Sequence, residues 1–167
     1  PVMKMRPARF FAGMLAALTL CVCTLPAGAA PSQSSVPAVQ SFSFARSGVA
    51  VEQARSYQIV ETGRGRFARL ELYYAYFVVL PVTDEEMASF SVLLAECGIC
   101  GWNGFHETDP DALDGESFSL TAAFAGGGAL AACGSNRFPA NYAQTAARIE
   151  AFFHTLLASY EIDVELL

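Results

Sequence analysis

Three cysteines are the side chains of this chain with the clearest chemical potential. Cys97 and Cys100 are separated by two residues, and Cys133 follows further along. A Cys-x-x-Cys pair is a redox motif when it opens a helix, because the helix dipole there stabilises the thiolate. Here the apolar pattern places the pair at the end of a helix, where the dipole disfavours a thiolate. The spacing therefore predicts structural cysteines rather than a redox centre.

An acidic loop over residues 101–115 carries the other groups that could act on a substrate. It contains His106 and the carboxylates Asp109, Asp111 and Asp114. The acids miss the calcium-loop spacing by one residue, and the cysteines with His106 match no zinc-ligand spacing. We therefore expect no metal and no cofactor. His106 with a nearby carboxylate could serve a small hydrolase, but no nucleophile elbow, metalloprotease motif or phosphate-binding loop accompanies it.

Trp102 and Phe105 open the same loop and give it a second interpretation. Aromatic side chains are enriched at protein contact surfaces, so Trp102, Phe105 and the acidic loop are a candidate contact surface. A single tryptophan next to a helix end is, however, more often part of the core. Both interpretations stay open, and no catalytic residue is predicted. The candidate binding residues are Trp102, Phe105, His106, Asp109, Asp111 and Asp114.

Three short motifs lie between Gly98 and Tyr142. They read Trp-Asn-Gly-Phe over 102–105, Leu-Asp-Gly-Glu-Ser-Phe-Ser-Leu over 113–120, and Gly-Ser-Asn-Arg-Phe-Pro-Ala-Asn-Tyr over 134–142. In these motifs the chain resembles an uncharacterised family of small bacterial exported proteins. The resemblance implies an α+β domain and carries no activity with it.

The first 29 residues have the pattern of a cleaved secretory signal peptide. Lys4, Arg6 and Arg9 precede an uninterrupted apolar run over residues 10–25. Small residues follow, with alanines at the −3 and −1 positions of a cut after Ala29. The apolar run is shorter than the ~20 residues that cross a bilayer, so we expect cleavage rather than a membrane anchor. The sequence therefore predicts a secreted or periplasmic protein.

Export places the cysteines in an oxidising compartment, where a disulfide is expected. Cleavage of the signal peptide leaves Cys97, Cys100 and Cys133, so one of them stays free. A bond from Cys133 to Cys97 or Cys100 would close a loop of about 35 residues and stabilise the fold by ~2–4 kcal/mol. A bond between Cys97 and Cys100 is the alternative.

Charge and composition narrow the class of partner. Cleavage removes three of the ten basic residues and leaves seven arginines against sixteen acids, a net charge of about −9. Nucleic acids and anionic membranes select clustered Lys and Arg, so we expect neither as a partner after cleavage. Residues 30–46 are rich in Pro, Ser and Gln and predict a flexible stalk. Residues 47–167 then fit a single domain.

The first half of this domain predicts a hairpin followed by a helix. Residues 54–62 alternate, and residues 67–80 form an aromatic and β-branched run after a glycine turn. Thr83 and Glu86 have the spacing of a capping box at a helix start, and Gly98 suits the helix end. The inward stripe of this helix is Met87, Phe90, Leu94 and Cys97.

The second half predicts the same order of elements. Residues 117–124 and 129–135 alternate on either side of three glycines, so we expect a hairpin in which Phe124 pairs with Leu130. Asn141 is the predicted cap of a helix that runs to Tyr160. The inward stripe of that helix is Tyr142, Ala146, Ile149, Phe153, Leu156 and Tyr160.

The order strand, strand, helix, strand, strand, helix predicts an α+β fold. Two hairpins would form one antiparallel sheet, with both helices packed on one face. For such a domain we expect a binding or interaction module with an unknown protein or small-molecule partner. The alternatives are the small extracytoplasmic hydrolase built on His106 and a purely structural envelope protein.

Overall fold

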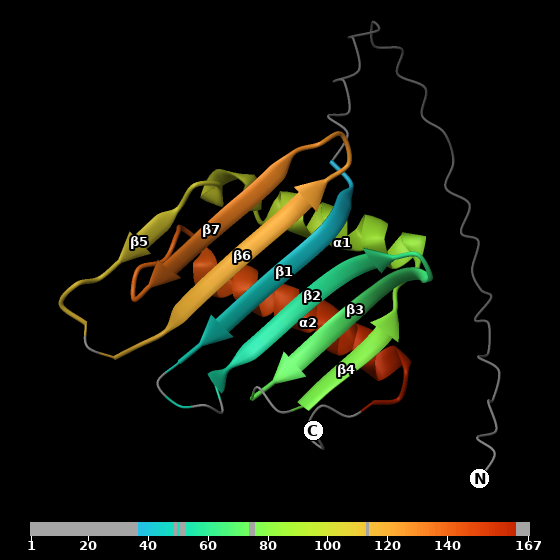
Figure 1. The fold of residues 1–167 in the computed structure, drawn as a ribbon, viewed down its shortest axis with the longest axis horizontal. Coiled ribbons are helices and arrows are strands. Elements are labelled where there is room, and N and C mark those ends of the chain that lie inside the picture. Colours follow the sequence, from blue (N-terminus) through green and yellow to red (C-terminus); the bar gives the residue numbers. More distant parts are fainter. Residues whose placement is uncertain (1–36, 49, 51–52, 74–75, 113, 163–167) are drawn as a thin grey trace, which may run out of the picture. The chain divides into compact units, whose positions relative to one another are not determined.

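The computed structural model describes residues 37–162 except 49, 51, 52, 74, 75 and 113. These residues form one seven-stranded sheet in the order β4-β3-β2-β1-β6-β7-β5, and both helices lie on the same face of it (Figure 1). No helix among the described residues is long and apolar enough to cross a membrane. The predicted signal peptide lies outside the described residues. The α+β class predicted from the sequence is confirmed.

A four-stranded meander opens the fold, and its first strand was not predicted. The strands are β1 (Val39–Ser47), β2 (Arg55–Thr62), β3 (Gly65–Leu72) and β4 (Tyr76–Pro81). β1 is the central strand, between β2 and β6, although its residues fall mostly in the predicted stalk. Phe42 and Phe44 on β1 are fully buried, and this burial gives the segment a place in the core.

The long strand predicted over residues 67–80 is two strands, β3 and β4. The chain turns at Tyr73, which adopts a left-handed backbone conformation with φ of 57°. β4 then pairs antiparallel with β3, so that Leu70 lies opposite Val78. Tyr73 is aromatic and carries no turn signature, because left-handed residues are usually Gly or Asn. The predicted order of two hairpins, each followed by a helix, is therefore wrong in its details.

Helix α1 (Asp84–Glu96) has the predicted capping box. The Thr83 hydroxyl accepts a hydrogen bond from the Glu86 amide, and the Glu86 carboxylate accepts one from the Thr83 amide. Met87, Phe90 and Leu94 are buried, as the stripe predicts. Gly98 follows in the left-handed conformation and leads into the short 3₁₀ helix η2 (Ile99–Trp102).

Three more strands complete the sheet. They are β5 (His106–Thr108), β6 (Ser117–Phe124) and β7 (Ala129–Ser135). β6 and β7 form the predicted hairpin, but Ala122 rather than Phe124 lies opposite Leu130, so the register differs by two residues. A shift of two keeps every side chain on its predicted face. β5 falls in the predicted acidic loop and pairs parallel with β7.

Helix α2 (Tyr142–Ser159) ends the fold and follows its predicted stripe except at the last residue. Asn141 precedes it in a left-handed conformation, without a side-chain capping hydrogen bond. Tyr142, Ile149 and Phe153 are buried against the sheet and α1. Tyr160 is 43% exposed, and its hydroxyl donates to the Pro81 carbonyl oxygen.

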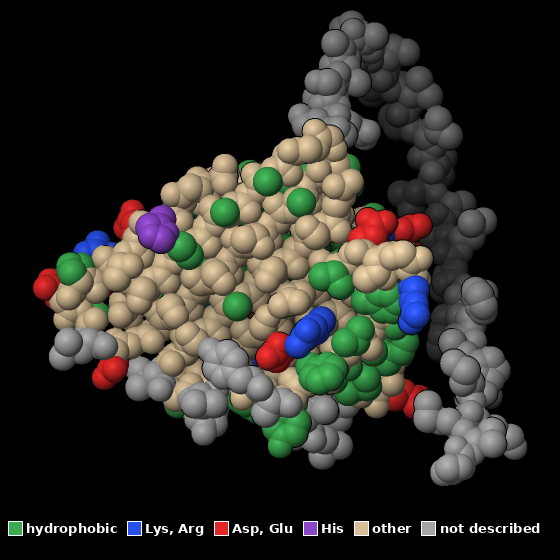
Figure 2. Space-filling view, in the orientation of Figure 1, with side chains coloured by type: hydrophobic (Ala, Val, Ile, Leu, Met, Phe, Trp, Pro, Cys, Tyr) green, Lys and Arg blue, Asp and Glu red, His purple; other side chains and the backbone are tan. Residues whose placement is uncertain are grey.

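The sheet therefore has one covered face and one open face. Inward positions of the strands carry large apolar side chains, such as Tyr57, Ile59, Phe118 and Leu120, which pack under the helices. Outward positions on β1, β6 and β7 carry serine, threonine, alanine and Cys133. Figure 2 looks onto this open face, where few large side chains stand above the backbone except over β3 and β4. Small residues leave room on this face for something else to bind.

Candidate functional site

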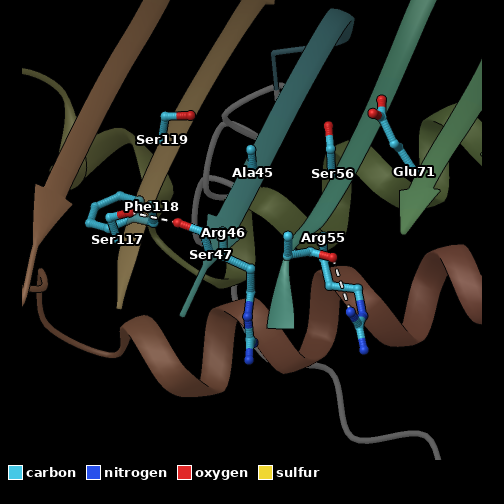
Figure 3. A pocket seen from close by; sticks show the side chains of 10 residues that line it. Ala45, Arg46, Ser47, Arg55, Ser56, Glu71, Ser117, Phe118 and Ser119 are labelled. Atoms are coloured by element: carbon cyan, nitrogen blue, oxygen red, sulfur yellow. Dashed lines mark hydrogen bonds between the residues drawn. The ribbon is translucent and has the colours of Figure 1, made fainter. Parts of the chain in front are cut away.

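The open face is hollowed near the ends of β1, β2 and β6. The cavity measures about 370 Å³ and is open to solvent. Figure 3 shows the side chains that line it, with Ser56 and Glu71 coming from β2 and β3. Its volume lies within the range of about 300–1,000 Å³ that holds small-molecule ligands. The residues around it are Ala45, Arg46, Ser47, Ala54, Arg55, Ser56, Glu71, Ser117, Phe118 and Ser119.

Small outward side chains create this hollow. Ser47 on β1 lies opposite Ser117 on β6 and Ala45 lies opposite Ser119, so four small side chains form a continuous floor. The hydroxyls of Ser47 and Ser117 are 2.8 Å apart and hydrogen bonded. Ser56 on β2 lies opposite Ala45 and extends the floor toward β3. The hollow thus presents hydroxyl groups above a backbone whose own hydrogen bonds are made in the sheet.

Two arginines lie directly opposite each other at the edge of the hollow. Arg46 on β1 pairs in register with Arg55 on β2. Like charges in opposing positions destabilise a sheet, so this pair needs compensation. Two carboxylates compensate the charge of Arg46. Its guanidinium donates to Glu150 at 2.9 Å, and its Nε lies 3.7 Å from Glu116. A second cavity of about 240 Å³, lined by Arg46, Gly48, Gln53, Arg55, Glu116 and Glu150, adjoins this cluster.

Two buried tyrosines complete the polar cluster on the covered side. The Tyr142 hydroxyl donates to Glu116 at 2.8 Å. Burial, followed by the hydrogen bond to Glu116, raises the pKa of Tyr142 well above its ordinary value of 10.0. Burial, followed by the charge of Glu150, raises the pKa of Tyr57 in the same direction. Both phenols therefore stay protonated, and Tyr142 donates to one of the two carboxylates that balance Arg46.

An exposed apolar area adjoins the hollow on its β3 side. We call Val60, Phe77 and Val79 the β4 patch; they project from β2 and β4 on the open face, where Figure 2 shows apolar side chains gathered. Phe77 is 65% exposed, and the Arg69 guanidinium lies over its ring at 5.2 Å. Arg69 also pairs with Glu71, which lines the hollow. The hollow and the β4 patch thus meet at β3.

A thiol and an imidazole lie side by side on the other side of the hollow. His106 on β5 is directly opposite Cys133 on β7, and its Nδ1 is 2.7 Å from the Cys133 sulfur. Cys133 is in turn opposite Ser119, which lines the hollow. The hydrolase hypothesis placed His106 beside a carboxylate, but this ring nitrogen contacts a thiol. The nearby Asp109 carboxylate pairs with Arg137 and accepts a hydrogen bond from the Asp111 amide.

The predicted contact residues do not gather into one surface. Trp102 is only 4% exposed, and its indole nitrogen donates to the Ala140 carbonyl, so it belongs to the core. Phe105 is half-buried against Phe118 in the same aromatic cluster. His106, Asp111 and Asp114 are exposed, and Asp109 is half-buried. None of the six candidate binding residues lines either cavity described above.

The predicted disulfide is absent, and Cys97, Cys100 and Cys133 are all free. Cys97 and Cys133 do not form a disulfide because the sheet lies between them. Cys97 closes α1 and packs against the core on the covered face, whereas Cys133 alternates with buried Ala132 and faces the open side. A disulfide requires Cα atoms within about 7 Å and converging Cβ bonds, which opposite faces of a sheet do not provide.

Sequence reasoning missed the residues of the hollow and of the thiol–imidazole pair. Ser47 and Ser56 belong to no motif, and the motif that contains Ser117 and Ser119 carries no activity with it. Arg46 and Arg55 are separated by the turn between two strands, one of which was unpredicted. The signal that could have found β1 is the alternation Ser-Phe-Ser-Phe over 41–44. Comparison with protein-family models, curated proteins and solved structures gave no significant match for this chain.

Proposed function

We propose that the chain is an exported binding module that holds a small polar molecule in the hollow of its open face. The observation that carries this proposal is the hollow itself, about 370 Å³ of space lined on the open face by the hydroxyls of Ser47, Ser56, Ser117 and Ser119 and the carboxylate of Glu71 (Figure 3). Export rests on the leader pattern of residues 1–29.

The charges around the hollow indicate which kind of ligand it suits. Arg46 is balanced by Glu116 and Glu150, and Glu71 is balanced by Arg69. A strongly charged ligand would have to displace one of these existing partners. Serine hydroxyls, in contrast, can donate and accept hydrogen bonds without a cost in ionic contacts. The hollow therefore suits an uncharged or zwitterionic molecule that carries hydroxyl or amide groups, such as a sugar, an amino acid or a short peptide.

A phenylalanine at position 119 tests the hollow. Ser119→Phe fills the space from β6, whereas Thr121→Phe adds a similar volume on the same strand and face but outside the lining. We expect saturation-transfer NMR with glucose, glycine and glycylglycine to detect at least one ligand bound by the wild-type chain. Ser119→Phe should weaken that binding about tenfold or more, a loss of ~1.4 kcal/mol or more, and Thr121→Phe should not.

Thermal unfolding of both variants controls for damage to the sheet. If Ser119→Phe unfolds at the same temperature as Thr121→Phe and still binds like the wild type, the hollow is not the ligand site. Failure of all three probes to bind the wild-type chain at about 10 mM would likewise count against the proposal. Even a dissociation constant of about 1 mM, which corresponds to only ~4 kcal/mol of binding free energy, would give detectable binding at that concentration.

A second function, self-association, is favoured by β4. This strand is at the edge of the sheet, contains no charged residue over Tyr76–Pro81, and exposes Phe77 and Val79. Unprotected apolar edge strands are templates for pairing with another chain. We propose that two copies pair β4 antiparallel about a twofold axis at Val78. Phe77 of each copy then lies opposite Val79 of the other, an aromatic–β-branched pair on the open face.

A lysine in the edge strand tests this pairing. Val79→Lys places a charge in the pair with Phe77, whereas Val92→Lys changes an equally exposed valine on α1. We expect light scattering during size-exclusion chromatography to give a dimer for the wild type and Val92→Lys, and a monomer for Val79→Lys. A wild-type monomer at protein concentrations up to about 1 mM would exclude the pairing, since even weak specific dimers form there.

A further inference from the structure

The geometry points to Cys133 as a reactive thiol that His106 deprotonates, with a disulfide as its substrate. The two side chains are adjacent because the backbone pairing of β5 with β7 places them side by side. His106 and Cys133 are directly opposite in the parallel β5–β7 ladder, and the Cys133 amide donates to the Phe105 carbonyl at 2.9 Å. Opposite residues of a ladder project on the same face. The sulfur-to-Nδ1 distance of 2.7 Å is therefore a product of strand register.

The position of the pair allows both proton transfer and access. His106 is exposed, so its imidazole can exchange protons with water. With the proton on Nε2, Nδ1 is free to accept the thiol proton. Small side chains surround Cys133 on the open face: Ala131 and Ser135 along β7, and Ser119 across on β6. A disulfide can approach the sulfur over these residues without moving a large side chain.

Disulfide exchange suits this site better than acyl transfer does. Acyl transfer needs N–H donors that stabilise an oxyanion beside the nucleophile. The amides of Ala131 and Cys133 on β7 already have acceptors, because Ala131 donates to the Asn103 side chain and Cys133 donates to the Phe105 carbonyl. Disulfide exchange needs only a thiolate and an accessible S–S bond. The pair meets that requirement with the residues that the structure describes.

The exchange needs no reactant besides the Cys133 thiol and the disulfide. His106 Nδ1 takes the proton of the Cys133 thiol, and the thiolate attacks one sulfur of the disulfide. The S–S bond of the substrate breaks as a new bond forms between that sulfur and Cys133. The leaving thiolate takes the proton from the imidazolium. One thiol and one disulfide enter, and one thiol and one mixed disulfide leave.

The reactivity of Cys133 is independent of ligand binding in the hollow. The hollow could bind its ligand with an inert Cys133, and Cys133 could react while the hollow stays empty. The two are neighbours because Ser119 lies between them, opposite Cys133 and in the lining of the hollow. A bound ligand would then shield the thiol, but the reactivity itself is a property of β5 and β7.

The test uses an aromatic disulfide, 5,5′-dithiobis(2-nitrobenzoic acid), on the purified, reduced full chain, with the modified cysteine identified by peptide mass spectrometry. At about pH 7 an ordinary thiol is only a few per cent ionised, which leaves room for a rate gain of about tenfold. We expect Cys133 to react about tenfold faster than Cys100, an exposed cysteine of the same chain. His106→Gln should slow Cys133 about tenfold and leave Cys100 unchanged.

The pH profile and a second histidine separate activation from mere exposure. His154 is exposed on α2, so His154→Gln is the matched control and should leave both rates unchanged. The difference between wild type and His106→Gln should shrink toward about pH 10, where a thiol ionises without a base. Equal rates for Cys133 and Cys100, or no effect of His106→Gln in a folded chain, would overturn the proposal.

Discussion

Truncation of Phe153 to alanine is expected to lower the free energy of unfolding by about 3–5 kcal/mol. The side chain is 2% exposed and sits where α2, α1 and the sheet meet. Its ring contacts Tyr57 on β2 at 5.1 Å and Phe90 on α1 at 6.0 Å between centroids. Removal leaves a cavity bordered by three elements, and rigid aromatic neighbours close such a cavity poorly.

Urea denaturation of two single variants, Phe153→Ala and Tyr160→Ala, tests this loss of stability. Tyr160 is the matched control because it is an aromatic residue of the same predicted stripe. Its side chain is 43% exposed, so its truncation should cost less than about 1 kcal/mol. A loss below about half a kilocalorie for Phe153→Ala would contradict the packing of α2 described above. Similar losses for both variants would mean that the two positions are equally buried.

The helices of this fold could be predicted because their signals are local. The capping box at Thr83 and the stripe of Met87, Phe90 and Leu94 lie within three turns of one helix, and the structure has them as predicted. The period of apolar residues decides which face is buried, whatever that face packs against. Tyr160 departs from its stripe because α2 ends at Ser159, and Tyr160 follows as the C-cap residue with non-helical backbone angles.

The strands were predicted less well because their limits depend on partners far along the chain. The alternation Phe42–Phe44 marks β1, but Pro, Ser and Gln just before it give the segment the composition of a stalk. The turn at Tyr73 lies within an aromatic run that has no Gly, Pro or Asn to indicate it. Here pairing with β3 and burial of Leu80 decide the structure, and tertiary contacts override local preference.

The candidate site was beyond prediction for the same physical reason. His106 and Cys133 are 27 residues apart, and only the parallel pairing of a three-residue strand places them in contact. The pattern of a single sequence does not show which residues of two distant strands lie opposite each other. The hollow arises from what small side chains leave unfilled, which no motif encodes. Of the predicted binding residues, only His106 lies in a site to which the structure assigns chemistry, and its partner is Cys133 rather than a carboxylate.

Raising the pH above about 10 is expected to destabilise the fold through Tyr142 and Tyr57. Both phenols have a pKa raised above the ordinary 10.0 by burial first, and then by Glu116 for Tyr142 and Glu150 for Tyr57. In the unfolded chain they ionise near pH 10, whereas in the folded chain they stay protonated. The unfolded state therefore binds fewer protons, and the stability present below pH 10 is lost as the pH rises.

The slope of this loss identifies the two residues. Each proton released on unfolding costs ~1.4 kcal/mol per pH unit, so two tyrosines give up to ~2.7 kcal/mol per unit above about pH 10. Tyr142→Phe keeps the ring contacts with Phe118 and Phe138 and removes one titrating group, so it should about halve the slope. Urea denaturation at several pH values measures the slope, and phenolate absorbance in the same samples measures the ionisation of the tyrosines. A Tyr142→Phe slope equal to that of the wild type would mean that Tyr142 ionises in the folded chain, which its burial and its hydrogen bond to Glu116 oppose.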